Sequence, residues 1–561
     1  ENQIDVTVGS HNHRRVVGDF NQQTGESSAL RVSAMKTTAD NNGAGSSIDK
    51  QGIAGSYRWG IGERDEFTAS LYRLENNNGI NYGMPWIKPT STSPASATTL
   101  LPVSPTSNYG MASDYNNGTA TYATVAHTHR FDGDTELTTR LRRGAYTRDQ
   151  RASTIRLTTG ENLSNFGPST VLTRGTQNKI QDLDSVYLQS DLSAKFDALG
   201  MKHELLSGID VAREQKTVYA ARTAAQGLGG VDLVKPNTTV GTPDDGAWVN
   251  EGSRVLRVNN QYTSTAWGVY AQDLVQIAPH WKLLGGLRYD NLNGNYDTFA
   301  APAANVSNGT LTNYKMNVGE WSKRVGALFQ PSERESYHFS AATSFNTSGD
   351  AYSLGASNAD VPPEQSINLE LGAKIDSADK NFTTRYALFR STKLHERNTD
   401  PLVDVAVLSG KRHATGLEMD FTGRITPRWE AYGSFMWIPD ARIDEAYKSP
   451  TGSDNERTGA RPSLTPRISA TLWNTYQING QWRVGAGLNH RGAQTPNRNP
   501  GWEAPAFTTA DVMAEYRVDE QLTFKGNVSN LTNKLYADQL YSGHYVPGAG
   551  RLVQVTGSYK F

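Results

Sequence analysis

The sequence predicts an all-β protein: a transmembrane antiparallel barrel of about 22 strands, with short turns at one end and long loops at the other. Three observations predict it. The last segment, 551–561, places Val553, Val555, Gly557, Tyr559 and Phe561 on one face and mostly polar residues on the other. The same two-residue alternation recurs along the chain. Tight turns and longer polar loops separate the alternating segments.

The number of strands follows from these connections. Tight turns are expected at 24–27, 63–66, 132–134, 197–200, 278–280, 331–335, 377–380, 426–428, 479–481 and 518–520. Longer loops rich in Gly, Asn, Ser, Thr and Pro are expected at 11–14, 39–51, 77–116, 160–178, 222–253, 293–317, 347–363, near Asn398, and at 439–462, 492–505 and 538–550. Eleven loops and ten turns imply about 22 strands, and an even number places both chain ends on the turn side. The turns are therefore assigned to the periplasm and the loops to the exterior.

Individual strands alternate as a barrel wall requires. Leu30, Val32 and Ala34 share one face, and Arg31 and Ser33 share the other. The first strand, 1–9, is expected to pair with the last one, because a closed barrel joins its two end strands. Aromatic residues recur beside the proposed turns, where a girdle at the membrane interface is expected. They are Phe67, Phe131, Phe196, Trp281, Tyr337, Phe382, Trp429 and Trp482. Their repeated offset favours a membrane barrel over a soluble β-protein.

The composition excludes several classes of function. A net charge of -1 argues against electrostatic binding of nucleic acid as the main role. With no cysteine, the chain has neither thiolate metal sites nor a cysteine nucleophile. The mean hydropathy of -0.58 is that of a polar chain. It is compatible with a membrane barrel, because barrel strands are apolar only at every second position and the average hides them. We find no phosphate-binding glycine loop, nucleophile elbow or zinc-binding helix motif, so no enzymatic activity is predicted.

Several motifs resemble those of TonB-dependent outer-membrane receptors. They include Asn530-Leu-Thr-Asn-Lys-Leu-Tyr536, Val546 to Arg551, the terminal Phe561, Gly268 to Asp273, Gly285 to Asp290, and Thr465-Pro-Arg467 with Leu472 to Tyr476. The resemblance covers the whole chain and implies the barrel of such a receptor, with no resident cofactor. Asn81-Tyr-Gly-Met-Pro-Trp86 most resembles the receptors for ferric catecholate siderophores.

The resemblance also implies partners. These are a ferric siderophore, outer-membrane lipid and lipopolysaccharide, the barrel assembly machinery, and the TonB–ExbB–ExbD system acting through a plug; the receptor would be a monomer. Residues 1–561 all have the pattern of a barrel domain, so the plug and the TonB box are expected to be absent from this chain. The sequence starts without a signal peptide, which indicates a processed or truncated product. The alternatives are a passive pore, or a receptor for another iron chelate, haem or cobalamin.

Two sets of residues are candidates for ligand binding. Arg140, Arg142 and Arg148 share one face of the seventh predicted strand, where they would either guide an anionic ferric catecholate or pair with carboxylates. Loop aromatics would either stack on catechol rings or pack together to order the loops. They are Tyr82, Trp86, Tyr109, Tyr115, Trp248, Trp502 and Tyr541, with His544 beside them.

Two His-x-His pairs have a spacing that places both rings on one strand face. They are His11 with His13, and His127 with His129. Two ligands are too few for a metal site, so solvated or polar positions are the default interpretation and no metal site is predicted.

Overall fold

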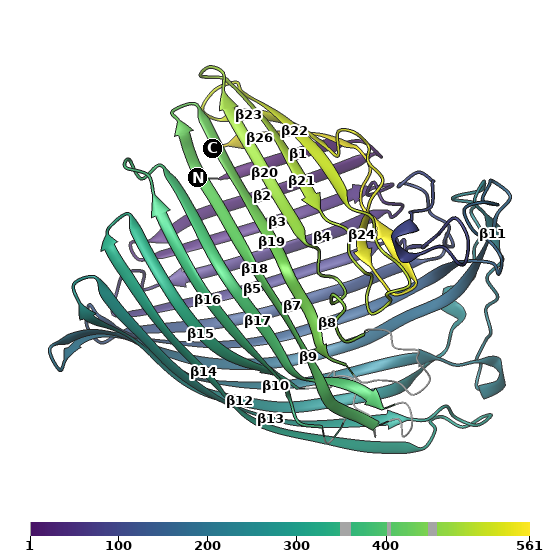
Figure 1. Ribbon diagram of the computed structural model, residues 1–561, viewed down its shortest axis with the longest axis horizontal. Helices are drawn as coiled ribbons and strands as arrows, with labels where there is room; N and C mark the ends of the chain where they lie inside the picture. The colour runs from purple at the N-terminus through teal and green to yellow at the C-terminus, as the bar shows by residue number, and fades with distance from the viewer. Residues whose placement is uncertain (1, 348–358, 360, 401–404, 447–456) are drawn as a thin grey trace.

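The computed structural model describes residues 2–347, 359, 361–400, 405–446 and 457–561. Within them, the main sheet has 23 strands. One of these, β11, pairs with β9 along only two residues. The other 22 form a closed antiparallel wall, as the sequence predicts (Figure 1). No helix in the described part of the chain is long and apolar enough to cross a membrane.

The wall strands are β1 (Gln3–Gly9), β2 (His13–Gly25), β3 (Ser28–Ala39), β4 (Ile48–Trp59), β5 (Asp65–Asn78), β7 (Tyr115–Arg130), β8 (Thr135–Leu157), β9 (Val171–Ala198), β10 (Met201–Ala221), β12 (Leu256–Ala278), β13 (Trp281–Phe299), β14 (Leu311–Ser332), β15 (Glu335–Asn346), β16 (Glu364–Asp376), β17 (Phe382–Asp400), β18 (Val405–Thr426), β19 (Trp429–Glu445), β20 (Ile468–Gln477), β21 (Trp482–Arg491), β22 (Phe507–Arg517), β23 (Leu522–Ser529) and β26 (Leu552–Lys560). The connections contain β6 (Met84–Pro85), η1 (Ala95–Ala97), η2 (Ala224–Gln226), β11 (Thr238–Thr239), η3 (Glu251–Ser253), β24 (Ala537–Leu540) and β25 (His544–Pro547).

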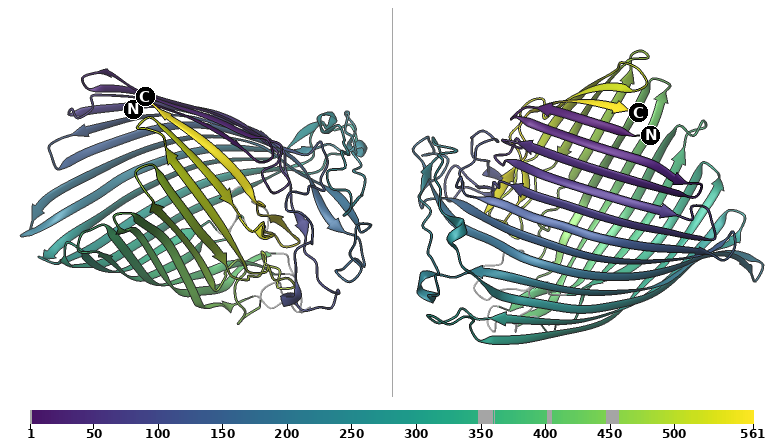
Figure 2. Two further views of the ribbon diagram at one scale, coloured as in Figure 1. Left: turned by 90° about the horizontal axis from the view of Figure 1, so that it is seen from above. Right: turned by 180° about the vertical axis from the view of Figure 1, so that it is seen from behind.

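The first and last strands close the barrel. β1 pairs with β26 from Gln3 opposite Lys560 to Gly9 opposite Gln554. The two chain ends therefore lie side by side in every view (Figures 1 and 2). This pairing confirms the predicted seam.

The two faces of the seam differ as the alternation predicts. Val6 and Val8 are 48% and 56% exposed, and Val553 and Val555 lie beside them on the outer face. Thr7, on the inner face, is buried and shares a hydrogen bond of 2.8 Å with Thr556. The apolar face is therefore the outer one, which lipid covers in a membrane barrel.

Each of the ten predicted turns overlaps the connection between two consecutive wall strands. The loops are less accurately predicted. β9 begins at Val171, and β13 and β14 reach Phe299 and Leu311, so the loops predicted at 160–178 and 293–317 are too long. Asn398 lies in β17 rather than in a loop. The predicted loop at 347–363 falls largely outside the described residues. The loop predicted at 439–462 begins too early, because β19 continues to Glu445, and residues 447–456 of it lie outside the described residues.

The wall differs in height around the barrel. The tall wall, defined as β8, β9, β10, β12, β13 and β14, has strands of 19 to 28 residues. The short wall, defined as β20 to β23, β26 and β1, has strands of 7 to 11 residues. About 9 to 11 residues cross a bilayer. On β9 the exposed large apolar residues lie between Val186 and Phe196, so the first half of this strand extends beyond the membrane on the loop side.

Candidate ligand-binding site

Two loops that are far apart in the sequence form a small sheet over the loop end of the barrel. β6 belongs to the loop between β5 and β7, and β24 and β25 belong to the loop between β23 and β26. β25 pairs with β24 and with β6, so that Tyr545 lies opposite Met84 and His544 opposite Pro85. The small sheet thus joins a loop of the short wall to a loop near the tall wall (Figure 1).

A hydrophobic core lies beneath this sheet. Tyr545 and Leu101 are fully buried, and the Leu101 N–H donates a hydrogen bond of 2.9 Å to the Tyr545 hydroxyl. The ring of Trp86 lies 4.9 Å from that of Tyr545. Leu172 and Ile155, from the tall wall, complete the buried cluster. Burial of large side chains on this scale gives the loops a core of their own.

Buried charges fix the neighbouring loops to the tall wall. Lys235 is only 1% exposed at its side chain, and its Nζ lies 3.1 Å from Asp114 Oδ1 and 3.6 Å from Glu251 Oε1. It also donates to the Ser153 hydroxyl on β8 at 2.9 Å. Glu251 in turn accepts from Arg254 at 2.5 Å. Because each buried charge has an opposite partner, the network holds the loops without an unpaired ion.

Above the core, three aromatic rings form a stack. The rings of Tyr541 and His544 are 4.5 Å apart with an interplanar angle of 12°. The ring of Tyr82 is 5.2 Å from that of His544, at 30°. Tyr541 is 36% exposed, so the stack keeps a face open to solvent. The structure therefore brings together three of the predicted aromatic residues.

Two arginines of the tall wall lie close to this stack. The guanidinium of Arg156 lies close to Gly543. A Cβ atom added to this glycine would be only 3.1 Å from Arg156 Nη1. Arg148 stands on the same face of β8 and makes a hydrogen bond to Gln150. The positive charges of both arginines act on Tyr82. Aromatic faces and guanidinium groups therefore occur together at this site.

The environment of the stack shifts two of its pKa values. Burial, and then the positive charge of Arg156, lower the pKa of His544 to about 4, so its imidazole is neutral near pH 7. Burial raises the pKa of Tyr82, and Tyr541 raises it further, while Arg148 and Arg156 oppose the shift. The Nε2 atom of His544 is buried and has no hydrogen-bond partner among the described residues. A ligand group that bonds to this nitrogen would satisfy it.

The other predicted arginines are placed lower on the inner wall. Leu141 is 49% exposed on the outer face, so Arg140 and Arg142 face the lumen. Arg140 forms an ion pair of 3.0 Å with Asp191. Arg142 donates to the Thr124 hydroxyl at 2.9 Å and lies over the ring of Tyr122. Arg140 therefore follows the carboxylate-pairing alternative that the sequence left open.

The remaining predicted aromatics lie outside the stack. Trp86 and Tyr109 are buried in the loop core, and in this conformation their rings order the loops. Trp502 packs against that core with Lys88 over its ring, 4.7 Å from the centroid. Tyr115 donates to Asp149 at 3.2 Å on the wall. Trp248 is 63% exposed and lies in another loop.

Sequence reasoning missed Arg156. A signal for it was present, because Arg156 continues the two-residue alternation of Arg140, Arg142 and Arg148 along the same strand. The apposition of Arg156 to Gly543 depends on how a distant loop folds, and no local pattern predicts that.

Comparison with known proteins agrees with this architecture. Residues 20–531 match the family described as TonB dependent receptor-like, beta-barrel. The chain belongs to the TonB-dependent receptor family. As a barrel of this family it is an outer-membrane protein, and the family consists of receptors and transporters rather than enzymes.

Individual relatives span the whole chain. The catecholate siderophore receptor Fiu of Escherichia coli O157:H7 is 26% identical over 601 aligned residues, which cover 99% of this chain and 76% of Fiu. The crystal structure of the siderophore receptor PiuA from Acinetobacter baumannii has a TM-score of 0.89 at 23% identity and covers 100% of this chain and 82% of PiuA. The closed form of Fiu from E. coli K12 has a TM-score of 0.85 at 23% identity, over 100% of this chain and 81% of Fiu. This chain therefore shares the barrel fold of PiuA and Fiu.

Proposed function

We propose that this chain is the barrel of a receptor that takes up a ferric siderophore of the catecholate class, energised by TonB. The observation that carries the proposal is the stack of Tyr82, His544 and Tyr541 beside Arg148 and Arg156. A ferric catecholate complex combines flat aromatic rings with a strong negative charge. Aromatic faces suit the rings, and guanidinium groups suit the charge. The similarity to a receptor named for catecholate siderophores supports the same ligand class.

A plug domain is part of the proposal. In a 22-strand barrel the lumen is too wide for the wall side chains to fill, so it needs a separate segment to close it. The relatives are longer than this chain, which aligns with 76% of Fiu. We propose that a plug with a TonB box works with this barrel and that the energised step passes through it.

Ligand binding by the complete receptor, barrel and plug together, tests the proposal. A panel of ferric catecholates, ferric hydroxamates, haem and cobalamin would be titrated while tryptophan fluorescence is recorded. We expect a ferric catecholate to bind most tightly. Replacing Tyr82 and Tyr541 together by Ala should weaken binding by roughly tenfold to one hundredfold, because each stacked ring contributes about 0.5 to 1.5 kcal/mol.

Trp321→Ala is the control, because Trp321 is a 56% exposed aromatic on β14 that is not a candidate for ligand binding. It should leave the affinity unchanged. Indifference of the receptor to every catecholate would refute the ligand class. A large, steady conductance of the complete receptor in planar bilayers would instead identify a passive pore.

A further inference from the structure

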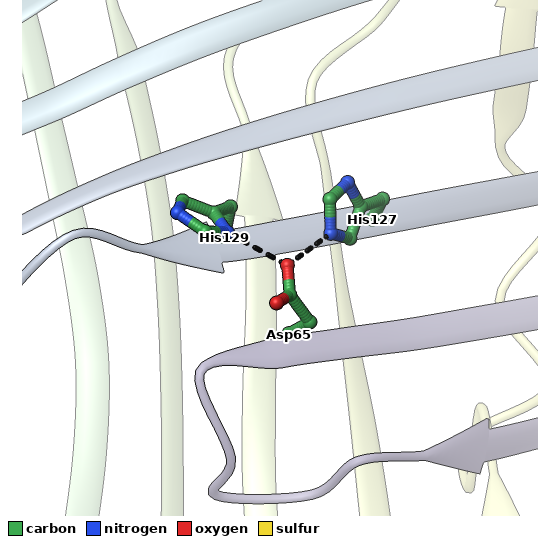
Figure 3. A group of neighbouring side chains, drawn as sticks. All are labelled: Asp65, His127 and His129. Atoms are coloured by element: carbon green, nitrogen blue, oxygen red, sulfur yellow. Dashed lines mark hydrogen bonds and ion pairs between the residues drawn. The ribbon is translucent and has the colours of Figure 1, made fainter.

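One cluster of potential metal ligands lies away from the loops, near the turn side of the barrel. His127 Nε2 lies 2.8 Å from Asp65 Oδ1, and His129 Nδ1 lies 2.7 Å from the same oxygen (Figure 3). The three ligand atoms all lie within 4.8 Å of one another. In the described part of the chain, this is the one group of three or more such side chains that could hold a metal ion. The carboxylate supplies the third ligand that the His-x-His spacing alone lacks.

The cluster faces outward. On β5 and β7, Leu71 and Val125 are exposed on the outer face, and Asp65, His127 and His129 share that face by strand alternation. The opposite face carries Glu66, which is buried and paired with Arg58 and Arg130. These two guanidinium groups are therefore engaged by Glu66 and do not face the cluster. The site is also separate from the lumen.

Aromatic neighbours hold both imidazoles in place. Phe67 stacks on His127 at 4.4 Å and 12°, and Phe131 meets His129 edge-on at 4.7 Å. Asp65 is the first residue of β5, and its side chain is 46% exposed. The carboxylate can thus shift by the few tenths of an ångström that an inserted ion requires. The three side chains remain accessible to an ion from the periplasm.

We infer that Asp65, His127 and His129 form a binding site for a divalent transition-metal ion of the zinc type at the periplasmic rim of the outer barrel surface. Two imidazole nitrogens and one carboxylate oxygen are ligands that Zn²⁺ accepts at about 2.0 to 2.2 Å. Three protein ligands leave one tetrahedral position for water. The ion would link β5 to β7, next to the turn before β5 and the turn after β7.

Zinc titration of the purified, chelator-treated chain in detergent tests this inference. We expect isothermal titration calorimetry with zinc chloride to show one site, and cobalt(II) to give the visible absorption of a low-symmetry complex. Asp65→Asn should weaken zinc binding at least about tenfold. The double variant Asp65→Asn with His127→Asn should abolish the site. The heat-dependent gel mobility of each variant would show that the barrel is folded.

Two matched controls separate a built site from general histidine binding. His11 and His13 have the same spacing but are not among the clustered ligands, so replacing both by Asn should leave zinc binding unchanged. The second control is His203, a single imidazole that pairs with Asp273 at 2.6 Å. Replacing His203 by Asn should also leave zinc binding unchanged. The inference is overturned if the unaltered chain binds no zinc, or if the double variant of Asp65 and His127 binds zinc as tightly as the unaltered chain.

Discussion

The tall and short walls contribute differently to the candidate ligand site. The tall wall holds Arg148 and Arg156 on β8, which is paired with β7 and β9 over most of its length. The short wall supplies Tyr541 and His544 from a loop that follows an eight-residue strand. The tall wall therefore carries the charged groups on a strand hydrogen-bonded on both sides. The short wall carries the aromatic rings on a small sheet formed by its loop.

This difference indicates how the site is assembled. The loops near the tall wall are held by the buried charges around Lys235, whereas the loop of the short wall is held by apolar contacts around Tyr545. We expect the arginines and the rings to lie side by side only when both anchors are in place. Each anchor can be removed separately, so the contribution of each side can be measured.

Removing the apolar anchor should have the largest effect. Tyr545→Ala deletes a fully buried ring that packs against Trp86, and we expect the free energy of local opening to fall by about 4 kcal/mol. Hydrogen exchange of segments 84–87 and 544–547 measures this change. Tyr545→Phe should cost only about 1 kcal/mol, because it keeps the ring and removes the hydroxyl, which accepts from the Leu101 N–H and donates to Met84 Sδ at 4.0 Å.

Tyr559→Ala is the control for the apolar anchor. Tyr559 is 44% exposed on the outer face of β26, so its loss should leave exchange in the loops unchanged. Unchanged exchange in Tyr545→Ala would show that the small sheet does not depend on its core.

Removing the charged anchor should have the next largest effect. Lys235→Met leaves Asp114 and Glu251 buried with one cation fewer, and we expect a loss of about 3 kcal/mol in the local stability of the loops near the tall wall. Hydrogen exchange around residues 112–114 and 235 measures it. Adding Asp114→Asn should recover part of the loss, because it removes one unpaired charge.

The matched control is Lys380→Met, since Lys380 pairs with Glu333 on the exposed turn side. This variant should leave the local stability of the loops near the tall wall unchanged. If Lys235→Met also left this stability unchanged, the buried charges around Lys235 would not anchor the loops.

The sequence predicts the barrel well because its signals are local. Alternation identifies the outer face of β26, and turn residues locate all ten short connections. The height of the tall wall is not predicted, because strands above the membrane lose the apolar side of the alternation. Asn293, for example, lies within β13 although its surroundings have the composition of a loop.

The candidate site is predicted only in part, because it depends on contacts between distant segments. The resemblance of segment 81–86 and the loop composition select Tyr82, Tyr541 and His544. The burial of Trp86 and Tyr109 follows from a loop core made by segments more than 400 residues apart. Composition cannot distinguish a buried loop aromatic from an exposed one.

Removing charge from the tall wall should have a moderate effect on ligand binding. Arg148→Gln and Arg156→Gln should each weaken the binding of a ferric catecholate by the complete receptor about tenfold, or about 1.4 kcal/mol. The loss should shrink as salt rises, because screening weakens the charge interaction. Arg143→Gln is the matched control, since Arg143 lies on the outer face of the same strand. Equal affinities for all three variants would exclude a role for this charge.

The smallest effect is a pH dependence of the short-wall loop through His544. The ordinary pKa of 6.5 applies when the loop is open, and the closed loop lowers the pKa of His544 to about 4. Above pH 6.5 the imidazole is neutral in both forms, and His544 then adds no pH dependence. Between pH 6.5 and 4 only the open form binds the proton, so acid favours opening.

Hydrogen exchange of segment 541–547 at pH 7.5 and pH 5, corrected for the intrinsic exchange rate, measures this effect. The unaltered chain should show less protection at pH 5. His544→Gln should remove the difference, because an amide keeps a polar side chain but does not titrate in this range. A pH dependence that survives in His544→Gln would assign the effect to another group. Loss of the dependence in His544→Gln would assign it to His544, whose pKa is lowered both by burial and by Arg156 on the tall wall.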